Sequence, residues 1–404
     1  MSQPSVSVCG RTPSGLRFSS ARMWMAASMV TAVFMLSNSP TPLYVRWQAQ
    51  LGFSSGTLTV IFALYIAGLL GTLLVAGQLS DHYGRKPVLI PGLLAALAAC
   101  WLFAHADSIA MLALGRLLSG VSVGVIVSAG MAAVVDAGGI ERKSTAALLA
   151  SVAMVLGAGL GPLWAGAAAQ TLARPIAPIF AVEAVVLLAA LGVALRVPAH
   201  RAPTRGPLRL RMPHVPAANR LHVLCGIATF GPGITATSFV LALGPSLLAR
   251  LLGVRSPSLA GAMACAMFFT AVGVQFLVRK WPVARIFRAS AAATAVAMAS
   301  LILAIHASFT PALIVAALFA GAGQGLGQLG GLMLIGLNVP DHNRAQANAV
   351  LNIGGYIPAG LLPVATGYLI DAVGLAVAGT AFALVLGTIA LAGGAWAGRR
   401  AAGA

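Results

Sequence analysis

Charged side chains are scarce in this sequence. Asp, Glu, Lys and Arg together make up 8% of the 404 residues, and only 7 residues are acidic. In a typical soluble domain about a quarter of the residues are charged. Hydrophobic residues instead make up 59% of the chain. This balance excludes an ordinary soluble domain and is typical of a bundle of membrane helices.

Cysteines and the signatures of metal or nucleotide sites are also sparse. The four cysteines (Cys9, Cys100, Cys225 and Cys265) are scattered and show neither metal-ligand nor disulfide spacing. The chain has no phosphate-binding loop of the form G-x-x-x-x-G-K-[ST], no H-E-x-x-H and no cluster of histidine and cysteine. It also lacks a grouped nucleophile and base. We therefore expect no metal, no cofactor, no nucleotide and no enzymatic activity.

Long apolar runs are what the chain has in abundance. A helix needs about 20 apolar residues to cross the hydrocarbon core of a bilayer. Twelve runs meet or approach this length, so we predict an all-α membrane protein with twelve transmembrane helices. The predicted spans are residues 23–45, 56–79, 87–105, 108–135, 144–172, 175–195, 222–248, 257–278, 288–307, 311–338, 345–370 and 373–397.

The basic residues are distributed unequally between the two sides of this predicted bundle. An even number of spans places both termini on one side, and most of the 25 basic residues lie on that side. The exceptions are Arg46, Arg174, Arg250 and Arg255 on the other side and Arg116 inside a span. The positive-inside rule therefore predicts a multi-pass inner-membrane protein with both termini in the cytoplasm. A formal charge of +18 spread over short loops does not predict nucleic-acid binding.

The longest polar segment divides the chain into two sets of six spans. Residues 196–220 are rich in arginine and proline and contain no acid. This composition is typical of a solvated linker near anionic lipid head groups, and a regulatory or partner-docking role is the alternative. We predict an N-terminal tail (1–22), two six-helix bundles (23–195 and 221–397) joined by this cytoplasmic linker, and a C-terminal tail (398–404).

The turn between the second and third predicted spans reads GQLSDHYGRKP, residues 77–87. It resembles the cytoplasmic signature of the major facilitator superfamily. The matching positions are Gly77, Leu79, Ser80, Asp81, Gly84, Arg85 and Lys86.

Two further stretches resemble motifs of the same family. RLLSGVSVG (116–124) is similar to its fourth-helix motif, and GAGLGPLWAG (157–166) is similar to the fifth-helix motif of proton-driven exporters, with Ala165 where that motif usually has glycine. The resemblance is to the twelve-helix drug:proton antiporter group. It implies two pseudo-symmetric six-helix bundles that rock about a midplane cavity. Pro162 and Gly166 have counterparts in Pro363 and Gly367, which supports this internal symmetry.

The charged turn predicts a cytoplasmic gate between the two halves. Gly84 permits a tight reversal of the chain, and Asp81 is placed to meet the positive end of a neighbouring helix dipole. If the halves pack as in the family, that helix is the eleventh, which begins near Ala345. Arg85 needs an acid, and Asp136 at the end of the fourth span offers one. The alternative is that these charges only set topology and stabilise a turn.

Small residues in the fifth span predict close helix packing. Gly157 and Gly161 are four residues apart and share one face, so another helix can approach closely. Pro162 removes a backbone donor and favours a kink. We expect these residues, together with Gly166, to form a tight seam to the other half. Ordinary small-residue packing is the alternative.

Arg116 is the one basic residue inside a predicted span. An arginine there is costly unless it faces water or a partner, so we expect it to face the central cavity at the level of Asn38. Satisfaction by carbonyl or hydroxyl groups is the alternative. The resemblance implies that the first, fourth, seventh and tenth helices line this cavity, with aromatic side chains from the second and eleventh. The predicted substrate and proton pathway is therefore Asn38, Ser39, Thr41, Tyr65, Arg116, Ser119, Thr235, Thr237, Ser238, Gln324, Gln328 and Tyr356.

Glu183 is the one acid deep inside a predicted span. A carboxyl group in such a place can bind and release a proton, which makes Glu183 a candidate member of the pathway. The sixth helix is peripheral in the family, so packing against a polar neighbour is the alternative.

These features together predict a secondary active transporter that exports a small organic solute or drug against proton entry. A proton-coupled importer of a sugar or organic acid is the first alternative, and a non-transporting membrane sensor on the same fold is the second. The predicted cavity offers Arg116 and no acid, which indicates a neutral or anionic substrate. The expected partners are this small-molecule substrate, protons and the lipid bilayer.

Overall fold

The computed structural model describes residues 13–196 and 212–402, which are almost entirely helical and contain no β-strand. The long helices are α1 (Pro13–Asn38), α3 (Ser55–Tyr83), α4 (Lys86–Ala104), α5 (Ile109–Val125), α7 (Lys143–Thr171), α8 (Ile176–Arg196), α9 (Arg220–Arg250), α10 (Pro257–Val278), α11 (Val283–Ala307), α12 (Thr310–Asn338), α13 (Asp341–Val373) and α14 (Leu375–Ala402). The short elements are η1 (Thr41–Leu43), α2 (Tyr44–Leu51), η2 (Ile126–Gly130), α6 (Met131–Gly138), η3 (Ile140–Arg142) and η4 (Ala217–Asn219).

The long helices account for the predicted membrane spans. In the described part of the chain, 11 helices are long and apolar enough to cross a membrane. One of these spans, Ile109–Gly138, combines α5, the π-helical turn η2 and α6. α1 accounts for the first predicted span and packs against α7, α6 and α8. The prediction of an all-α bundle of twelve long helices is confirmed.

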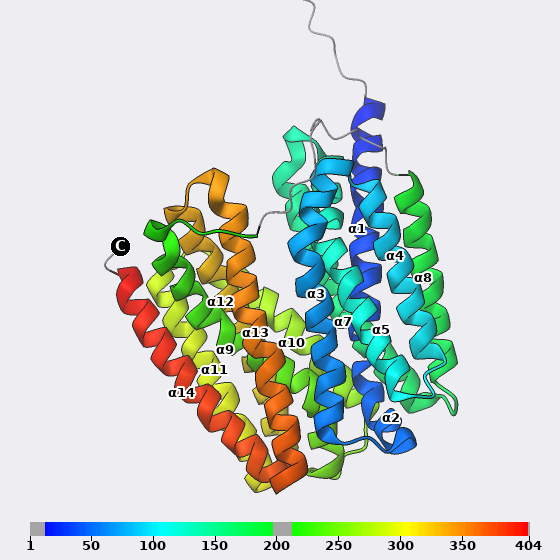
Figure 1. The fold of residues 1–404 in the computed structure, drawn as a ribbon, viewed down its shortest axis with the longest axis vertical. Helices are drawn as coiled ribbons and strands as arrows, with labels where there is room; N and C mark the ends of the chain where they lie inside the picture. The colour runs from blue at the N-terminus through cyan, green and yellow to red at the C-terminus, as the bar shows by residue number, and fades with distance from the viewer. Residues whose placement is uncertain (1–12, 197–211, 403–404) are drawn as a thin grey trace, which may run out of the picture.

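The helices form two groups that lie side by side (Figure 1). The first group is α1–α8 and the second is α9–α14, and the closest packing between them is of α7 on α10 and of α3 on α13. The groups meet at one end of the molecule and diverge toward the other. We call the diverging end, where α1 begins and α14 ends, the terminal end, and the other the opposite end. The predicted domain limits stay a prediction.

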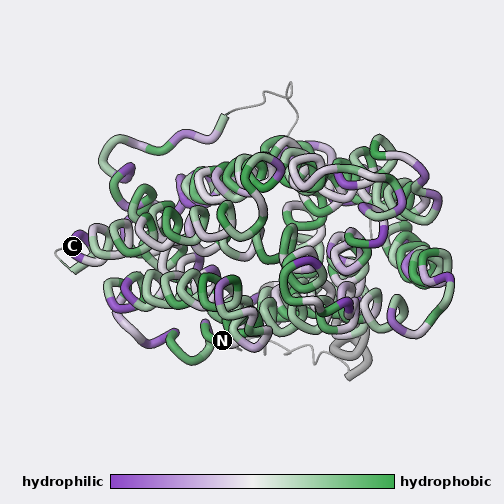
Figure 2. Tube along the Cα trace, turned by 90° about the horizontal axis from the view of Figure 1, so that it is seen from below, coloured by the Kyte–Doolittle hydropathy of each residue, from purple (hydrophilic) through white to green (hydrophobic). Residues whose placement is uncertain are grey.

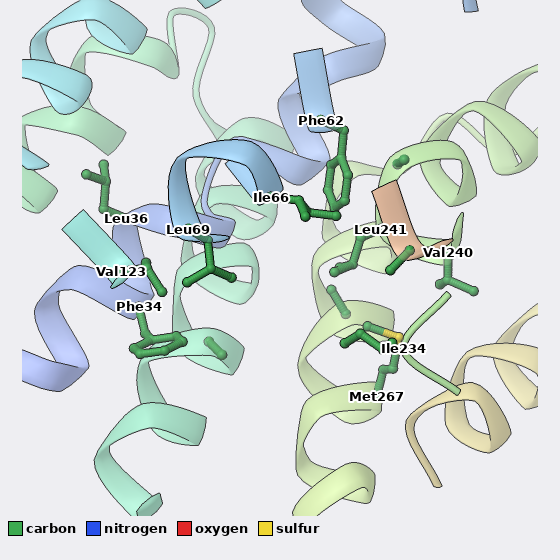
Figure 3. Packing of buried hydrophobic residues seen from close by; sticks show 14 of the residues in the cluster. Phe34, Leu36, Phe62, Ile66, Leu69, Val123, Ile234, Val240, Leu241 and Met267 are labelled. Carbon is green, nitrogen blue, oxygen red and sulfur yellow. The ribbon is translucent and has the colours of Figure 1, made fainter. Parts of the chain in front are cut away.

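Apolar side chains dominate both groups. Viewed from the opposite end, the chain is hydrophobic along most of its length in each group (Figure 2). Between the groups, Phe62 and Ile66 of α3 face Leu241 of α9 (Figure 3), and all three are buried. Burial of such side chains contributes about 1.5–3 kcal/mol each relative to water. In a bilayer that term vanishes for lipid-facing surface, so close packing matters more.

The limits of several predicted segments differ from the structure, among them those near the ends of the chain. α1 ends at Asn38, before the predicted limit at residue 45, because Pro40 and Pro42 cannot donate backbone hydrogen bonds. The chain turns there into η1 and α2. α1 begins inside the predicted tail 1–22, and α14 continues into the predicted tail 398–404. Residues 1–12, 197–211 and 403–404, and with them most of the predicted linker, lie outside the described ranges.

Candidate functional site

The charged turn between α3 and α4 holds a compact set of ion pairs. Arg85 Nε donates to Asp136 Oδ2 at 3.1 Å, and Arg85 Nη1 donates to Asp81 Oδ1 at 2.9 Å. Gly84 has a φ of 94°, a conformation that favours glycine. Lys86 Nζ donates to the carbonyl oxygen of Leu195 at the end of α8 at 2.6 Å.

The same contacts explain the protonation of Arg85. Partial burial lowers the pKa of Arg85, but the hydrogen bonds and charges of Asp136 and Asp81 outweigh burial, so the pKa is raised above its usual value. Arg85 therefore stays charged at any physiological pH.

Asp81 does not reach α13 in this arrangement. Its carboxylate is largely exposed and pairs with Arg85. At the start of α13, the described ion pair is a local one between Asp341 and Arg344, at 2.5 Å. The two groups of helices are thus not joined through Asp81 at the terminal end. Gly77 lies on the same turn of α3, where the nearest atom to an added side chain is Cβ of Ser128 in η2.

At the opposite end an aspartate does join the two groups. Asp371, near the end of α13, accepts hydrogen bonds from the backbone amides of Ser55 (2.9 Å) and Gly56 (2.8 Å) at the start of α3. A helix N-terminus carries partial positive charge, so an aspartate there is stabilising. Arg250 Nη1, at the end of α9, donates to Ser55 Oγ at 3.3 Å. We call the contact of Asp371 with Ser55 and Gly56 the clasp.

The sequence analysis did not single out Asp371. The available signal was its rarity, since it is one of 7 acids and lies where the eleventh span ends. Its partners carry no distinctive signal of their own, because they are backbone amides and serine hydroxyls.

The small residues of α7 divide between two partners. Side chains at Gly157 and Gly161 would clash with the carbonyl oxygens of Thr31 and Met35 in α1, so these glycines pack within the first group. Gly166 instead faces the carbonyl oxygen of Pro257 at the start of α10. Gly159 also faces α10, where Cys265 and Phe269 are the nearest residues. The seam between the groups is therefore made by one face of the motif, and the contact with α1 by another.

The contact that this motif makes with the other group has a symmetry-related counterpart in α13. The carbonyl oxygen of Pro162 lies against Gly261 of α10. Likewise, Gly367 of α13 lies against Ser55 and Thr59 of α3, where an added side chain would clash with both residues. Gly166 and Gly367 are the pair that the internal symmetry predicted, and each occupies a crossing between the groups.

Arg116 is buried among aromatic and polar groups of the first group. Its side chain is 1% exposed. Nε donates to the hydroxyl of Tyr44, and Nη1 donates to the carbonyl oxygen of Ser37 at 2.5 Å. The guanidinium carbon lies 5.1 Å from the ring centroid of Tyr44, 5.2 Å from that of Phe62 and 5.8 Å from that of Tyr65. Nη2 has no hydrogen-bond partner among the described residues.

Glu183 lies near the same end of α1. It is 0% exposed, and its Oε1 lies within hydrogen-bond distance of Ser39 Oγ. Ser39 Oγ also contacts the carbonyl oxygen of Met35 at 2.9 Å. Glu183 Oε2 has no partner among the described residues. The last residues of α1 and the turn after it thus connect the cation and the acid: Ser37 contacts Arg116, and Ser39 contacts Glu183.

Aromatic side chains hold this polar network in place. Trp47 of α2 stacks on Phe103 of α4 and Phe180 of α8, with ring centroids 6.2 Å and 6.3 Å away. Tyr44 packs edge-on against Trp47 at 5.9 Å. Sequence reasoning missed Ser37 and Tyr44, because their roles arise only from the turn that Pro40 and Pro42 impose.

The other predicted pathway residues of the first group surround this network. Asn38 Nδ2 donates to Ser37 Oγ at 2.9 Å, and Ser119 Oγ donates to the carbonyl oxygen of Arg116 at 3.0 Å. Thr41 is buried, and its hydroxyl has no partner among the described residues.

Apart from Tyr356, which lies close enough to Tyr65 of α3 to interact with it electrostatically, the predicted residues of the second group form no described contact with the network. The buried hydroxyls of Thr235 and Thr237 donate to carbonyl oxygens of their own helix, and Ser238 is 5% exposed. Tyr356 packs edge-on against Phe230 with centroids 6.2 Å apart. Gln324 and Gln328 of α12 are half-buried, and Gln324 Oε1 has no partner among the described residues.

Two pseudo-symmetric helix groups, clasped at one end and parted at the other, define a multi-pass membrane transporter. The comparisons with known proteins agree. The chain belongs to the Major Facilitator Superfamily, whose family model matches residues 23–307.

Individual relatives match only in part. The chain is 37% identical over 79 residues to multidrug resistance protein MdtL of Escherichia coli O45:K1 (strain S88 / ExPEC), which is 20% of each chain. It is 33% identical over 97 residues to MdtL of Klebsiella pneumoniae (strain 342), covering 23% of this chain and 25% of the relative. The matched segments thus span about a fifth to a quarter of the relatives' length.

Solved structures match over almost the whole chain. A bacterial homolog of the human lysosomal transporter Spinster, in an inward-facing and unoccupied conformation, superposes with a TM-score of 0.72 at 15% identity, covering 96% of this chain and 98% of that one. The nucleoside transporter NupG superposes with a TM-score of 0.69 at 10% identity, covering 93% and 98%. At these identities the likeness shows the fold alone.

Proposed function

We propose that this protein exports a small organic solute or drug across the inner membrane by alternating access, driven by proton entry, with the terminal end in the cytoplasm. The observation that carries the proposal is one-sided closure. The clasp joins the groups at the opposite end, while Asp81 is free of α13 at the terminal end. The short matches to MdtL, named a multidrug resistance protein, favour export of a drug-like solute.

The two ends offer matched contacts for the two states of such a cycle. The clasp is an aspartate of the second group on the N-terminus of α3. The proposed counterpart is Asp81 of the first group on the N-terminus of α13. An aspartate at a helix N-terminus contributes about 0.3–1 kcal/mol when exposed. Because both contacts are of this kind, exchanging one for the other costs little, and both states stay accessible.

Glu183 is the proposed proton carrier, and its hydrogen bonds support this role. The hydroxyl of Ser39 has one proton to donate, yet its oxygen contacts both the Met35 carbonyl and Glu183. Both bonds form together only when a protonated Glu183 donates to Ser39. Loss of that proton would make Ser39 turn from Met35 to the carboxylate, at the point where α1 ends. The proton thus acts on the same helix end that holds Arg116.

Arg116 is the proposed contact for the polar part of the substrate. Its Nη2 is a donor without a partner in the described part of the chain, and its other nitrogens are held by Tyr44 and Ser37. A neutral acceptor or an anion would satisfy it. A shift of the α1 end would change the position of this donor, which couples the substrate to the proton.

The proposal is tested in proteoliposomes that contain the purified protein and an imposed pH gradient. Uptake of a panel of drug-like and anionic solutes into vesicles that are acidic inside is expected for the exporter. With the gradient reversed, so that protons enter vesicles that are alkaline inside, solute uptake together with the protons would instead identify the importer. No transport of any solute in either gradient would support a sensor. Glu183→Gln should abolish gradient-driven transport but keep substrate exchange without a gradient, whereas Ser39→Ala should weaken the pH dependence only. Full gradient-driven transport by Glu183→Gln would exclude it as the carrier.

A further inference from the structure

A cavity lies at the opposite end, between the two groups of helices. Its volume is about 660 Å³, within the range of small-molecule sites. η1 and α2 of the first group form one wall, and the end of α9 and the start of α10 form the other. Most of its lining is apolar, including Leu43, Val45, Leu248 and Val254.

Three arginines line this cavity: Arg46 from α2, Arg250 from the end of α9 and Arg255 from the loop before α10. These are three of the four basic residues that the sequence places on the sparsely charged side of the bundle. No acid is among the lining residues of the described cavity. Arg46 and Arg255 form no ion pair within the described ranges, and Arg250 contacts only the Ser55 hydroxyl there.

Arg46 and Arg255 are thus exposed cations without a paired acid on opposite sides of the joint between the groups, and Arg250 shares Ser55 with Asp371. Arg46 belongs to one group and Arg250 and Arg255 belong to the other, so their mutual repulsion opposes closure of this end. An anion shared between them would turn the repulsion into an attraction. Guanidinium groups bind carboxylate and phosphate through paired hydrogen bonds.

We propose that this cavity is a binding site for an amphipathic organic anion, whose carboxylate or phosphate group lies between Arg46, Arg250 and Arg255 and whose apolar part lies on the leucine and valine wall. The site is distinct from the network of Arg116 and Glu183, and it does not depend on the direction of transport. Since it bridges both groups, an occupied site stabilises the closed opposite end. A free solute and an anionic lipid head group both carry the required chemistry.

The test measures binding of naphthalene-2-carboxylate to the purified protein in phosphatidylcholine nanodiscs by equilibrium dialysis, with empty nanodiscs as the blank. The neutral naphthalene-2-carboxamide is the matched probe. We expect saturable binding of the carboxylate and little binding of the amide. Arg46→Ala and Arg255→Ala should each weaken carboxylate binding about three- to fivefold, the range of an exposed charge contact. Arg174→Ala, which removes the fourth arginine of this side, should leave binding unchanged.

A second measurement locates the probe. In a variant without the native cysteines, Ala49→Cys places a thiol on the cavity wall, whereas Gln50→Cys places one beside it. Naphthalene-2-carboxylate should slow maleimide labelling at position 49 and not at position 50. Equal binding of acid and amide, equal effects of Arg174→Ala and Arg255→Ala, or no protection at position 49 would overturn the proposal.

Nanodiscs with added phosphatidylglycerol distinguish the two natural sources. With about 0.15 M salt, which screens the general surface charge beyond about 8 Å, displacement of the probe by phosphatidylglycerol in the wild type but not in Arg46→Ala would assign the site to lipid head groups. Unchanged probe binding would assign it to a free solute.

Discussion

The carboxylate of Asp371 lies 2.9 Å from the backbone nitrogen of Ser55, so that the end of α13 caps the start of α3. This contact joins two helix groups that are separate at the other end of the molecule. It uses a charged side chain on one side and, on the other, the backbone amides at the start of a helix together with the hydroxyls of Ser54 and Ser55. The contact adds to the packing of α7 on α10 and of α3 on α13, and one substitution can weaken it without disturbing that packing.

Asp371→Asn should shift the protein toward a state that is open at the opposite end. The amide keeps the shape of the carboxylate but loses the charge on the α3 N-terminus, which contributes about 0.3–1 kcal/mol. The population of the closed opposite end should fall about two- to fivefold relative to the open one. Fluorescence distance measurements between labels on α3 and α10 at this end would report the change.

Asp107→Asn is the matched control for this experiment. Asp107 is an exposed acid of the same end, in the turn between α4 and α5. The distance distribution should stay as in the wild type. If Asp107→Asn and Asp371→Asn give the same distribution, the clasp does not determine the closed state.

Removal of Arg85 or Asp81 should impair transport while membrane insertion stays largely intact. Arg85 links Asp81 to Asp136, and Asp81 is the proposed partner of α13 in the state closed at the terminal end. Asp136 and Asp81 raise the pKa of Arg85 above its ordinary value, so its contribution is fully present below that ordinary value and is lost only as the pH rises through the still higher folded-state pKa, far above the physiological range. The defect of Arg85→Ala should therefore be the same at pH 6 and pH 8, in a transport assay normalised to folded protein. Near-normal transport by both variants would reduce this turn to a topology signal.

Arg116→Ala should not transport, and Arg116→Lys should transport poorly. Lysine keeps the charge but has a single ammonium nitrogen in place of the planar fork, so it does not reproduce the separate bonds of Nε to Tyr44 and of Nη1 to the Ser37 carbonyl. Because the site is buried, the alanine variant also leaves polar groups unsatisfied at a cost of about 1–3 kcal/mol.

Tyr44→Phe separates the loss of a functional contact of Arg116 from the loss of folding stability. It removes one contact of Arg116 and keeps the aromatic packing on Trp47. We expect normal folding, by size-exclusion chromatography, with reduced transport. An active Arg116→Ala protein would remove Arg116 from the proposed site.

The topology is testable without any knowledge of the substrate. Lys280→Cys lies in the turn between α10 and α11 at the terminal end, and Ala173→Cys lies between α7 and α8 at the opposite end. In a variant that lacks the native cysteines, an impermeant maleimide should label position 173 from the periplasm and position 280 only after permeabilisation. Labelling of both positions from one side would contradict the proposed orientation.

Much of this architecture follows from the sequence because its signals are local. The length of an apolar run sets whether a helix can span the bilayer, and the bias of basic residues between alternate loops predicts the orientation. The ion pair of Arg85 with Asp136 was predictable because few acids lie at that end of the bundle. Gly84 was predictable as a turn residue because glycine adopts positive φ at no steric cost, and its φ in the structure is 94°.

The tertiary structure decided which distant groups meet. Gly157 and Gly166 belong to one motif, yet one packs on α1 and the other on α10, because a helix presents different faces to different neighbours. Asp371 and Ser55 are far apart in the chain. No sequence signal pairs them, because the aspartate binds the N–H groups at the start of a helix and not an oppositely charged side chain.

For the same reason, the sequence predicted the charged members of the network but not their partners. Arg116 and Glu183 are rare residues in apolar spans, so the sequence by itself determined that each needs a special environment. Their partners Tyr44, Ser37 and Ser39 are common residues, and a turn after α1 brings them into place. Likewise Arg46 and Arg255 read as isolated surface charges until α2 and the start of α10 face each other. The type of a residue and its place in an apolar span determine which kind of partner it requires. Only packing in three dimensions determines which partner it contacts.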